Sequence, residues 1–103
     1  MCSKDTIEKI QWLASLKTKE ICGVVLKDNS IVEIKNVSTT NHTFIFDKTE
    51  WFKLLNTKPE IRCIYHSHVN GDPEPSKDDL ACQKRLNYDF LIVAGSKWRY
   101  ISA

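Results

Sequence analysis

Apolar residues recur along this chain with two different spacings, one typical of helices and the other typical of strands. Three segments have apolar residues every three or four positions, which predicts amphipathic helices. Short runs rich in β-branched and aromatic residues lie between those segments and predict strands. The expected helices cover about residues 3–16, 47–55 and 76–87, and the expected strands cover residues 20–27, 31–34, 43–46, 61–68, 90–94 and 98–101.

The order of these elements predicts a single-domain α/β sandwich, in which a mixed central β-sheet is flanked by about three helices. A chain of 103 residues is long enough for one hydrophobic core and too short for two. Residues 1–103 are therefore expected to form one domain. Turn-forming residues at 28–30 and 95–97 predict two β-hairpins, and a polar loop is expected at 37–42.

Charge and hydropathy exclude several classes of partner. Fifteen basic and 13 acidic side chains leave a net charge of +2, and they are scattered, so neither nucleic acid nor an anionic membrane surface is expected to bind. No apolar run reaches the roughly 18 residues of a membrane span, and the N-terminus lacks the apolar core of a signal peptide, which predicts a cytoplasmic protein. The four cysteines form no CxxC pair and are expected to be reduced and mostly buried.

Two histidines and one aspartate have the spacing of a metal site. His66 and His68 are two positions apart on a predicted strand, so both imidazoles project from the same face near its end. Asp79 follows eleven residues after His68, in the first turn of a predicted helix that a turn-rich loop can bring back to that strand end. Two imidazoles and a carboxylate suit zinc and leave a fourth position for a water molecule.

Two further residues supply the chemistry that such a site needs. Glu20 opens the first predicted strand, where it can take a proton from the metal-activated water and return it to the leaving amine. Ser76 can donate its hydroxyl to a developing oxyanion. Each has a simpler interpretation: Glu20 as a solvated residue at a strand edge, and Ser76 with Asp79 as the capping box of a helix. The histidines, in turn, can be hydrogen-bonded core residues.

The joint pattern is far more specific than any of its parts. Glu20 is followed by the HxH tripeptide at 66–68, seven residues, Ser76, two residues and Asp79. From average composition, the part from HxH onward should arise by chance less than once in about 10^5 positions. The pattern resembles the motif of the JAMM/MPN+ metalloproteases. This resemblance implies a JAB/MPN fold, related to that of cytidine deaminases, with one zinc ion per chain, general acid/base catalysis by Glu20 and transition-state support by Ser76.

The resemblance extends over nearly the whole chain and is closest to the phage and bacterial branch of the family. It rests on the E-x-C-G sequence at 20–23, the N-G-D-P-E-P-S loop at 70–76 and the helix start at Asp79-Leu80. It implies hydrolysis of a peptide or isopeptide bond, and a processing role in phage tail assembly. The implied partners are a phage tail protein, a peptidoglycan-hydrolase domain of the kind usually fused to this one, or a ubiquitin-like protein.

Two alternative functions stay open. One is a non-catalytic binding or scaffold module with the same fold, because a fold alone does not determine function. The other is a bacterial protease that trims a ubiquitin-like sulfur-carrier protein. A zinc deaminase is excluded because H-x-E and P-C-x-x-C are absent, and a metallo-β-lactamase because Asn70 and Gly71 replace its next ligands. A nucleophilic Cys22 or Cys63 beside a histidine is a weaker hypothesis.

Substrate contacts are expected from two segments, residues 69–75 and residues 37–44, because loops and strand edges form the peptide-binding grooves of such folds. A small domain with exposed sheet edges can also pair with a second copy, so an oligomer is compatible with the sequence.

Overall fold

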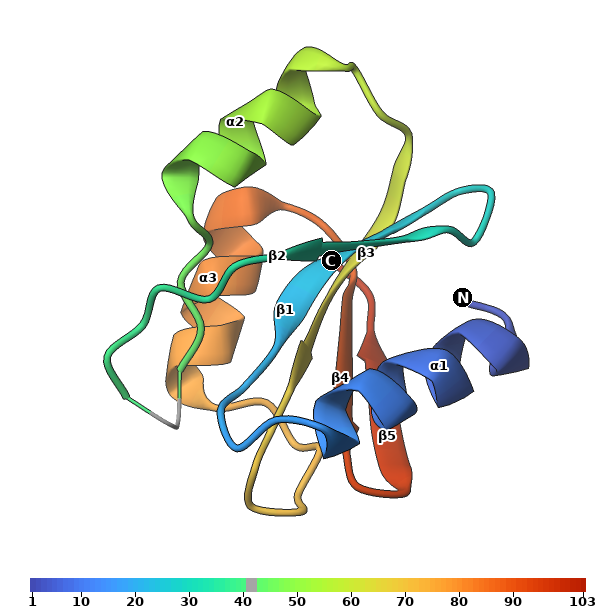
Figure 1. The fold of residues 1–103 in the computed structure, drawn as a ribbon, viewed down its shortest axis with the longest axis vertical. Coiled ribbons are helices and arrows are strands. Elements are labelled where there is room, and N and C mark those ends of the chain that lie inside the picture. The colour runs from blue at the N-terminus through green and yellow to red at the C-terminus, as the bar shows by residue number, and fades with distance from the viewer. Residues whose placement is uncertain (41–42) are drawn as a thin grey trace.

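A five-stranded mixed sheet runs through the middle of the molecule, with helix α1 against one face and helices α2 and α3 against the other (Figure 1). The computed structural model describes residues 1–40 and 43–103. The predicted α/β sandwich with a mixed central sheet is thereby confirmed. The elements in chain order are α1 (Lys4–Ser15), β1 (Cys22–Leu26), β2 (Ile31–Ile34), α2 (Lys48–Asn56), β3 (Ile61–Ser67), α3 (Lys77–Leu86), β4 (Phe90–Ala94) and β5 (Lys97–Ile101).

The strands lie in the order β2-β1-β3-β4-β5. Strand β1 is antiparallel to both β2 and β3, whereas β3 and β4 are parallel and α3 connects them. Strands β4 and β5 form the closing hairpin. Because β1 and β3 run in opposite directions, the start of β1 lies next to the end of β3, at the lower end of the view in Figure 1.

Local capping determines where each helix begins. The side chain of Ser3 accepts a hydrogen bond from the backbone N–H of Thr6 at 3.2 Å, and Asp47 and Ser76 cap the other two helices in the same way. Helix α3 ends at Asn87, whose φ of 60° places it in the left-handed region where a helix stops. Each helix of the described chain therefore begins at a residue whose side chain caps its first turn.

Alternating side chains of the central strands form two hydrophobic cores. Cys63 and Tyr65 of β3 point toward α1 and join Ile7 and Ile10. Ile64 of β3 points the opposite way, into a core completed by apolar side chains of α2, α3 and the segment before α2. This period of two assigns neighbouring positions of β3 to opposite layers. The even-numbered positions, which lead to His66, therefore lie on the α3 side.

The strand predicted at 43–46 is wrong. Only an isolated bridge between Asn36 and Phe46 forms there. The Asn36 side chain replaces a ladder: its amide donates to the carbonyl of Thr43, and its oxygen accepts from the N–H of Ile45. Two residues of the predicted loop at 37–42, residues 41 and 42, lie outside the described part of the chain.

The cysteines and the helices agree with two further expectations from the sequence. All four cysteines are free thiols; three are buried and Cys82 is half-buried, as predicted. Within residues 1–40 and 43–103, none of the helices has the length and apolar character needed to cross a membrane.

Candidate metal and catalytic site

The pairing of β1 with β3 brings together two segments that are 46 residues apart. Cys22 pairs with His66 in the sheet register. Beyond this pair, the N–H of Ser67 donates to the carbonyl of Ile21 at 3.0 Å, and the N–H of Ile21 donates to the Ser67 hydroxyl at 2.9 Å. These two bonds hold the residue next to Glu20 against the strand end. The prediction that Glu20 opens the first strand is wrong by two residues: β1 begins at Cys22, and Glu20 lies in the segment just before it.

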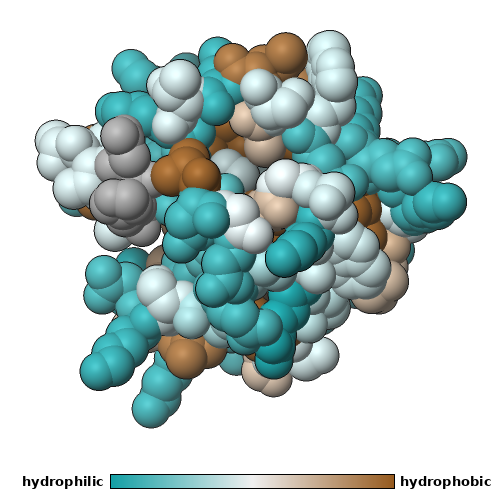
Figure 2. All heavy atoms as spheres, turned by 90° about the horizontal axis from the view of Figure 1, so that it is seen from below, coloured by the Kyte–Doolittle hydropathy of each residue, from teal (hydrophilic) through white to brown (hydrophobic). Residues whose placement is uncertain are grey.

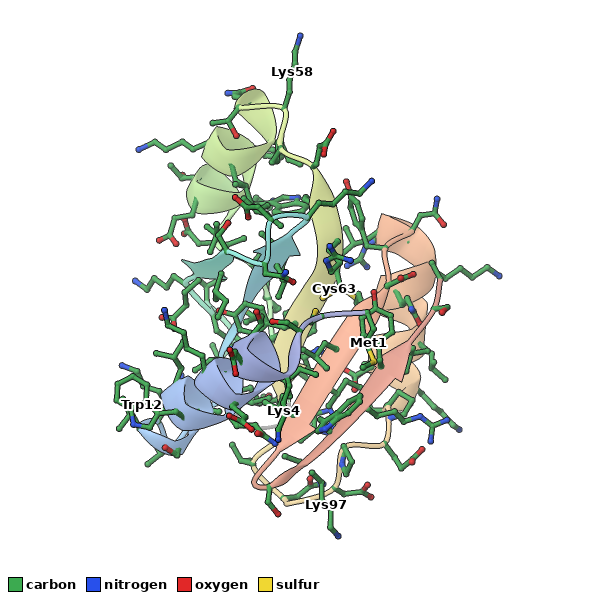
Figure 3. All side chains as sticks on the ribbon, turned by 90° about the vertical axis from the view of Figure 1, so that its right-hand side faces the viewer. Met1, Lys4, Trp12, Lys58, Cys63 and Lys97 are labelled. Atoms are coloured by element: carbon green, nitrogen blue, oxygen red, sulfur yellow. The ribbon has the colours of Figure 1, made fainter. Side chains whose placement is uncertain are left out.

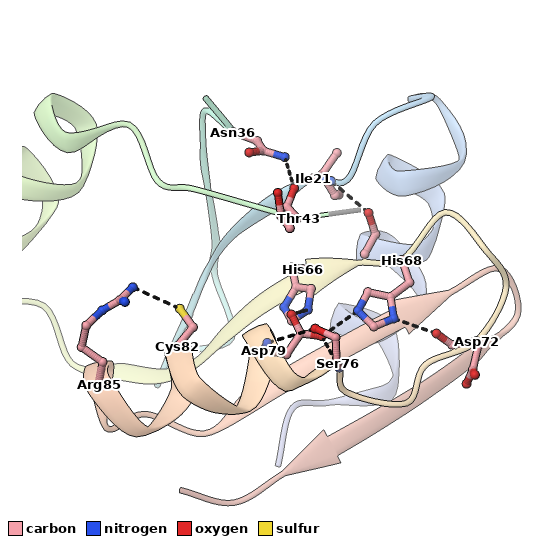
Figure 4. A network of polar contacts seen from close by, with 11 residues as sticks. Ile21, Asn36, Thr43, His66, His68, Asp72, Ser76, Asp79, Cys82 and Arg85 are labelled. Carbon is pink, nitrogen blue, oxygen red and sulfur yellow. Dashed lines mark hydrogen bonds and ion pairs between the residues drawn. The ribbon is translucent and has the colours of Figure 1, made fainter. Parts of the chain in front are cut away.

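Both histidines point at the same carboxylate. His66 Nε2 lies 3.0 Å from Oδ1 of Asp79, and His68 Nε2 lies 2.9 Å from Oδ2 (Figure 4). His66 is the penultimate residue of β3, His68 follows the strand directly, and Asp79 is in the first turn of α3. The structure thus brings the two histidines into contact with Asp79 at the end of β3 and the start of α3, although His68 lies just beyond the strand that the sequence predicts to include it.

The loop between β3 and α3 determines the tautomer of His68. Its Nδ1 lies 2.7 Å from the carbonyl oxygen of Asp72, which can only accept, so Nδ1 carries a proton. In a neutral imidazole, Nε2 is then a lone-pair acceptor that faces the negative Asp79 carboxylate. Such an arrangement is stable only if a proton or a metal ion lies between the two groups.

His66 is fully buried between aromatic rings. Phe44 stacks on its ring with centroids 4.5 Å apart, and Phe90 packs against it edge-on at 5.6 Å. Neither ring nitrogen of His66 has a hydrogen-bond partner among the described residues, since the 3.0 Å contact with Asp79 lacks hydrogen-bond geometry. Buried imidazole nitrogens almost always have partners. These unpaired nitrogens therefore fit coordination to a metal ion.

Glu20 is buried beside the two histidines. Only 4% of its surface is exposed, and its Oε1 has no hydrogen-bond partner in the described part of the chain. Ligand atoms of Glu20, His66 and His68 lie within 4.8 Å of one another. The amide of Asn36 donates to the backbone carbonyl of Glu20 at 2.8 Å. The carboxyl group is thus held at the histidines with one oxygen available for chemistry.

Ser76 and Asp79 form the reciprocal capping box that the sequence predicts. The N–H of Asp79 donates to the Ser76 hydroxyl at 3.0 Å, and the N–H of Ser76 donates to Asp79 Oδ2 at 2.9 Å. The cap therefore orients the carboxylate toward the histidines. The Ser76 hydroxyl proton is not used in the cap and is a remaining donor.

Burial and mutual contact shift the pKa values of all four ionisable groups. Burial raises the pKa of Glu20 to about 7, with a smaller contribution in the same direction from Asp79. Burial lowers the pKa of His66, which keeps that imidazole neutral. Burial is the largest single influence on His68 and Asp79 and opposes charge on both, but their contacts together outweigh it. Asp79 and the Asp72 carbonyl raise the pKa of His68, and His66 and His68 hold the pKa of Asp79 far below its ordinary value. The site therefore favours a neutral His66 imidazole and an ionised Asp79, and Glu20 can gain or lose its proton near neutrality.

The cysteines near the site serve packing rather than nucleophilic chemistry. Cys22 is fully buried, its thiol donates to the carbonyl of Ile34, and burial raises its pKa. Cys63 lies on the face of β3 opposite His66, as the alternation of the strand predicts. Neither thiol forms a pair with a described histidine.

Comparison with known proteins decides the family. A family model described as prokaryotic homologs of the JAB domain matches residues 6–101. The chain belongs to this JAB family. A comparison with curated proteins found no match.

Solved structures resemble the fold of this JAB domain at low sequence identity. A protein from Desulfitobacterium hafniense is 19% identical, with a TM-score of 0.68 over 96% of this chain and 79% of that one. A JAB1/MPN domain protein from Archaeoglobus fulgidus is 18% identical, with a TM-score of 0.64 over 94% and 83%. A protein from Salinibacter ruber is 15% identical, with a TM-score of 0.59 over 99% and 81%. At these identities the similarity establishes the fold alone.

Sequence reasoning missed three groups that build the site of this JAB domain. Ser67 was seen only as the residue between two histidines, although its hydroxyl ties β3 to the segment before β1. The Asp72 carbonyl and the Asn36 amide orient His68 and the Glu20 backbone. Two sequence signals for these groups were available: Ser67 lies between two site histidines, and Asn36 follows an edge strand. The carbonyl of Asp72 left no signal, because every residue has one.

Two cavities border the site. One, of about 440 Å³, lies beside Glu20 and extends between the segment 17–22 and the segment 33–36. The other, of about 430 Å³, is lined by His68 and Val69 among others. The end of the molecule that carries these segments is mainly hydrophilic, with apolar side chains in separate places (Figure 2). The assignment of substrate contacts to 69–75 and 37–44 stays a prediction.

Glu20 should make the stability of the metal-free JAB domain depend on pH. Its carboxyl binds a proton near pH 4.5 in the unfolded chain and up to about 7 in the folded one. Its stabilising contribution is therefore complete below pH 4.5 and is lost as the pH rises through 7. Relative to Glu20→Gln, the wild type should lose about 3 kcal/mol of unfolding free energy between pH 4.5 and 8. Urea unfolding in a chelator measures this, and parallel pH profiles would contradict it.

Proposed function

We propose that this JAB domain is a zinc-dependent metallopeptidase of the JAMM type, in which His66, His68 and Asp79 hold the metal and Glu20 is the general base. One observation carries the proposal: two imidazole nitrogens converge on one carboxylate at 2.9 and 3.0 Å, beside a buried glutamate oxygen that has no partner among the described residues. A purely structural cluster would be expected to satisfy these buried atoms within the protein.

The donor set supports zinc in particular. Two imidazoles and a carboxylate suit zinc, and a catalytic zinc site has three protein ligands and an open position. The Asp72 carbonyl on the far nitrogen of His68 supplies the outer hydrogen bond that orients a ligand histidine. The apolar rings around His66 limit access of water on that side.

Each remaining group has a role in hydrolysis. Zinc, when bound, would lower the pKa of a water molecule and polarise the substrate carbonyl. Glu20 takes a proton at its carboxylate and delivers it to the leaving amine, for which a pKa near 7 is well suited. The hydroxyl proton of Ser76, held in place by the helix cap, stabilises the developing oxyanion. We assign the cavity of about 440 Å³ beside Glu20 to the substrate peptide.

The resemblance to the JAMM/MPN+ metalloproteases supports the proposed substrate class. The scissile bond is a peptide or isopeptide bond, in a phage tail protein or near the C-terminus of a ubiquitin-like protein. A non-catalytic scaffold module with the same fold is the competing function, and the effect of Glu20→Gln on turnover distinguishes the two.

Elemental analysis of protein purified without chelator tests the metal site. We expect about one zinc ion per chain in the wild type and less than a tenth of that in Asp79→Ala, because the variant loses one of the three ligands. Asp78→Ala is the matched control: Asp78 is the preceding residue, is exposed and should keep the metal. Wild-type protein that contains no zinc and binds none when it is added would overturn the proposal.

A further inference from the structure

A pair of buried cysteines lies on the face of the sheet opposite the metal site. The sulfur atoms of Cys2 and Cys63 are 3.3 Å apart, and the exposed fractions of the two residues are 4% and 0%. Cys63 stands in the middle of β3, whereas Cys2 precedes the N-cap of α1. Figure 3 shows the N-terminal segment passing beside Cys63. Neither thiol has a part in the proposed hydrolysis.

We propose that Cys2 and Cys63 form a disulfide when the protein meets hydrogen peroxide, which makes this pair a site of reversible oxidative modification. A disulfide needs a sulfur separation of about 2.05 Å, so the two atoms must approach by only about 1.3 Å. Cys2 can make this movement because it lies outside helix and strand. Cys63 is held between β1 and β4 and stays in place.

The surroundings of the pair determine which sulfur reacts first. The hydrogen bond between the two thiols, followed by the nearby Arg62 guanidinium, lowers the pKa of Cys2, although burial opposes this. Arg62 also donates to the carbonyl of Met1 at 3.5 Å, which keeps the N-terminal segment over β3. Cys63 has the opposite bias, because hydrogen bonding to Cys2 and burial both raise its pKa. We assign Cys2 as the attacking thiolate because it lies outside the regular elements, whereas Cys63 is fixed within β3.

The reaction balances with peroxide as the oxidant. The Cys2 thiolate attacks one peroxide oxygen, the O–O bond breaks, and Cys2 becomes a sulfenic acid while the released hydroxide takes up a proton to form water. The Cys63 sulfur then attacks the Cys2 sulfur, the S–O bond breaks, and the hydroxyl leaves with the Cys63 proton as a second water. The two thiols lose two electrons, and one peroxide molecule is reduced to two waters.

Intact mass after alkylation tests this inference. The full chain is treated with hydrogen peroxide, quenched, denatured and alkylated with iodoacetamide. Untreated protein has four free cysteines and takes up four adducts; after peroxide we expect two, and peptide mapping should show a Cys2–Cys63 link that dithiothreitol reverses. Oxidised protein should also have a Tm at least about 5 °C higher, since the link closes a loop of some 60 residues.

Two variants make the result specific. Cys2→Ser removes one partner in a segment outside the regular elements and should leave all three remaining cysteines open to alkylation after peroxide. Cys82→Ser removes the half-buried cysteine and should retain the link. Uptake of four adducts by peroxide-treated wild type, or a link that maps to Cys82 or Cys22, would overturn the proposal. None of these readouts depends on zinc or on peptidase activity.

Discussion

Replacing Glu20 with glutamine should reduce peptidase turnover by about 10^2- to 10^4-fold, the usual contribution of a general base. The amide has nearly the shape of the carboxyl group but cannot accept the proton. The buried position and the backbone contact with Asn36 should be kept, so the fold and the zinc content should be unchanged. Turnover on a panel of fluorogenic peptides and isopeptides, with parallel zinc analysis, measures both effects.

Glu33→Gln is the matched control for this experiment. Glu33 borders the same cavity as Glu20 but is exposed, and its loss should leave turnover within about twofold of wild type. Unchanged turnover in Glu20→Gln would remove Glu20 from the mechanism. If the wild type holds zinc yet cleaves no member of the panel, and both variants bind the same partners as the wild type, the scaffold function would be favoured.

Replacing Gly23 with alanine should destabilise the protein by at least about 3 kcal/mol, more than most single substitutions. A Cβ at this position would lie 2.2 Å from the carbonyl oxygen of Val32 and 2.7 Å from the ring of Tyr65. Both neighbours are fixed: Val32 is paired with β1, and Tyr65 is fully buried. Relief of the overlap requires β1 and β2 to separate. Urea denaturation of wild type and variant measures the loss.

Gly95→Ala is the control that separates crowding from backbone strain. Gly95 has a φ of 61°, so alanine is strained there, but nothing lies within 4 Å of its added Cβ. We expect a cost of only about 1–2 kcal/mol from the left-handed backbone. If Gly23→Ala were as mild as Gly95→Ala, the close packing of Tyr65 over Gly23 would be contradicted.

The helices were predicted closely because their starting signals are local. Ser3, Asp47 and Ser76 each accept a hydrogen bond from the N–H three residues later, and that contact depends on almost nothing else in the chain. The strand at 43–46 failed for the opposite reason. Its pattern of apolar residues is suited to a strand, but the Asn36 side chain occupies the Thr43 carbonyl and the Ile45 N–H, and only the bridge between Asn36 and Phe46 forms.

The sequence by itself determined the fold class, the two histidines and the aspartate proposed as ligands, and the helix cap at Ser76. Each of these depends on short-range periodicity or on a spacing that can be counted along the chain. Glu20 was predicted from its place at the start of a predicted strand and from the resemblance, because its distance from the histidines along the chain carries no geometric information.

Only the tertiary structure decided which groups meet. Antiparallel pairing of β1 with β3 places Glu20 beside His68, and the Ser67 hydroxyl secures that placement. The Asp72 carbonyl selects the tautomer of His68. Every residue has a main-chain carbonyl, so the sequence does not indicate which one makes this contact. The tertiary fold also brings Cys2 and Cys63 together, although they are 61 positions apart in the chain. Pairing between strands depends on the free energy of the whole core, which no local pattern contains.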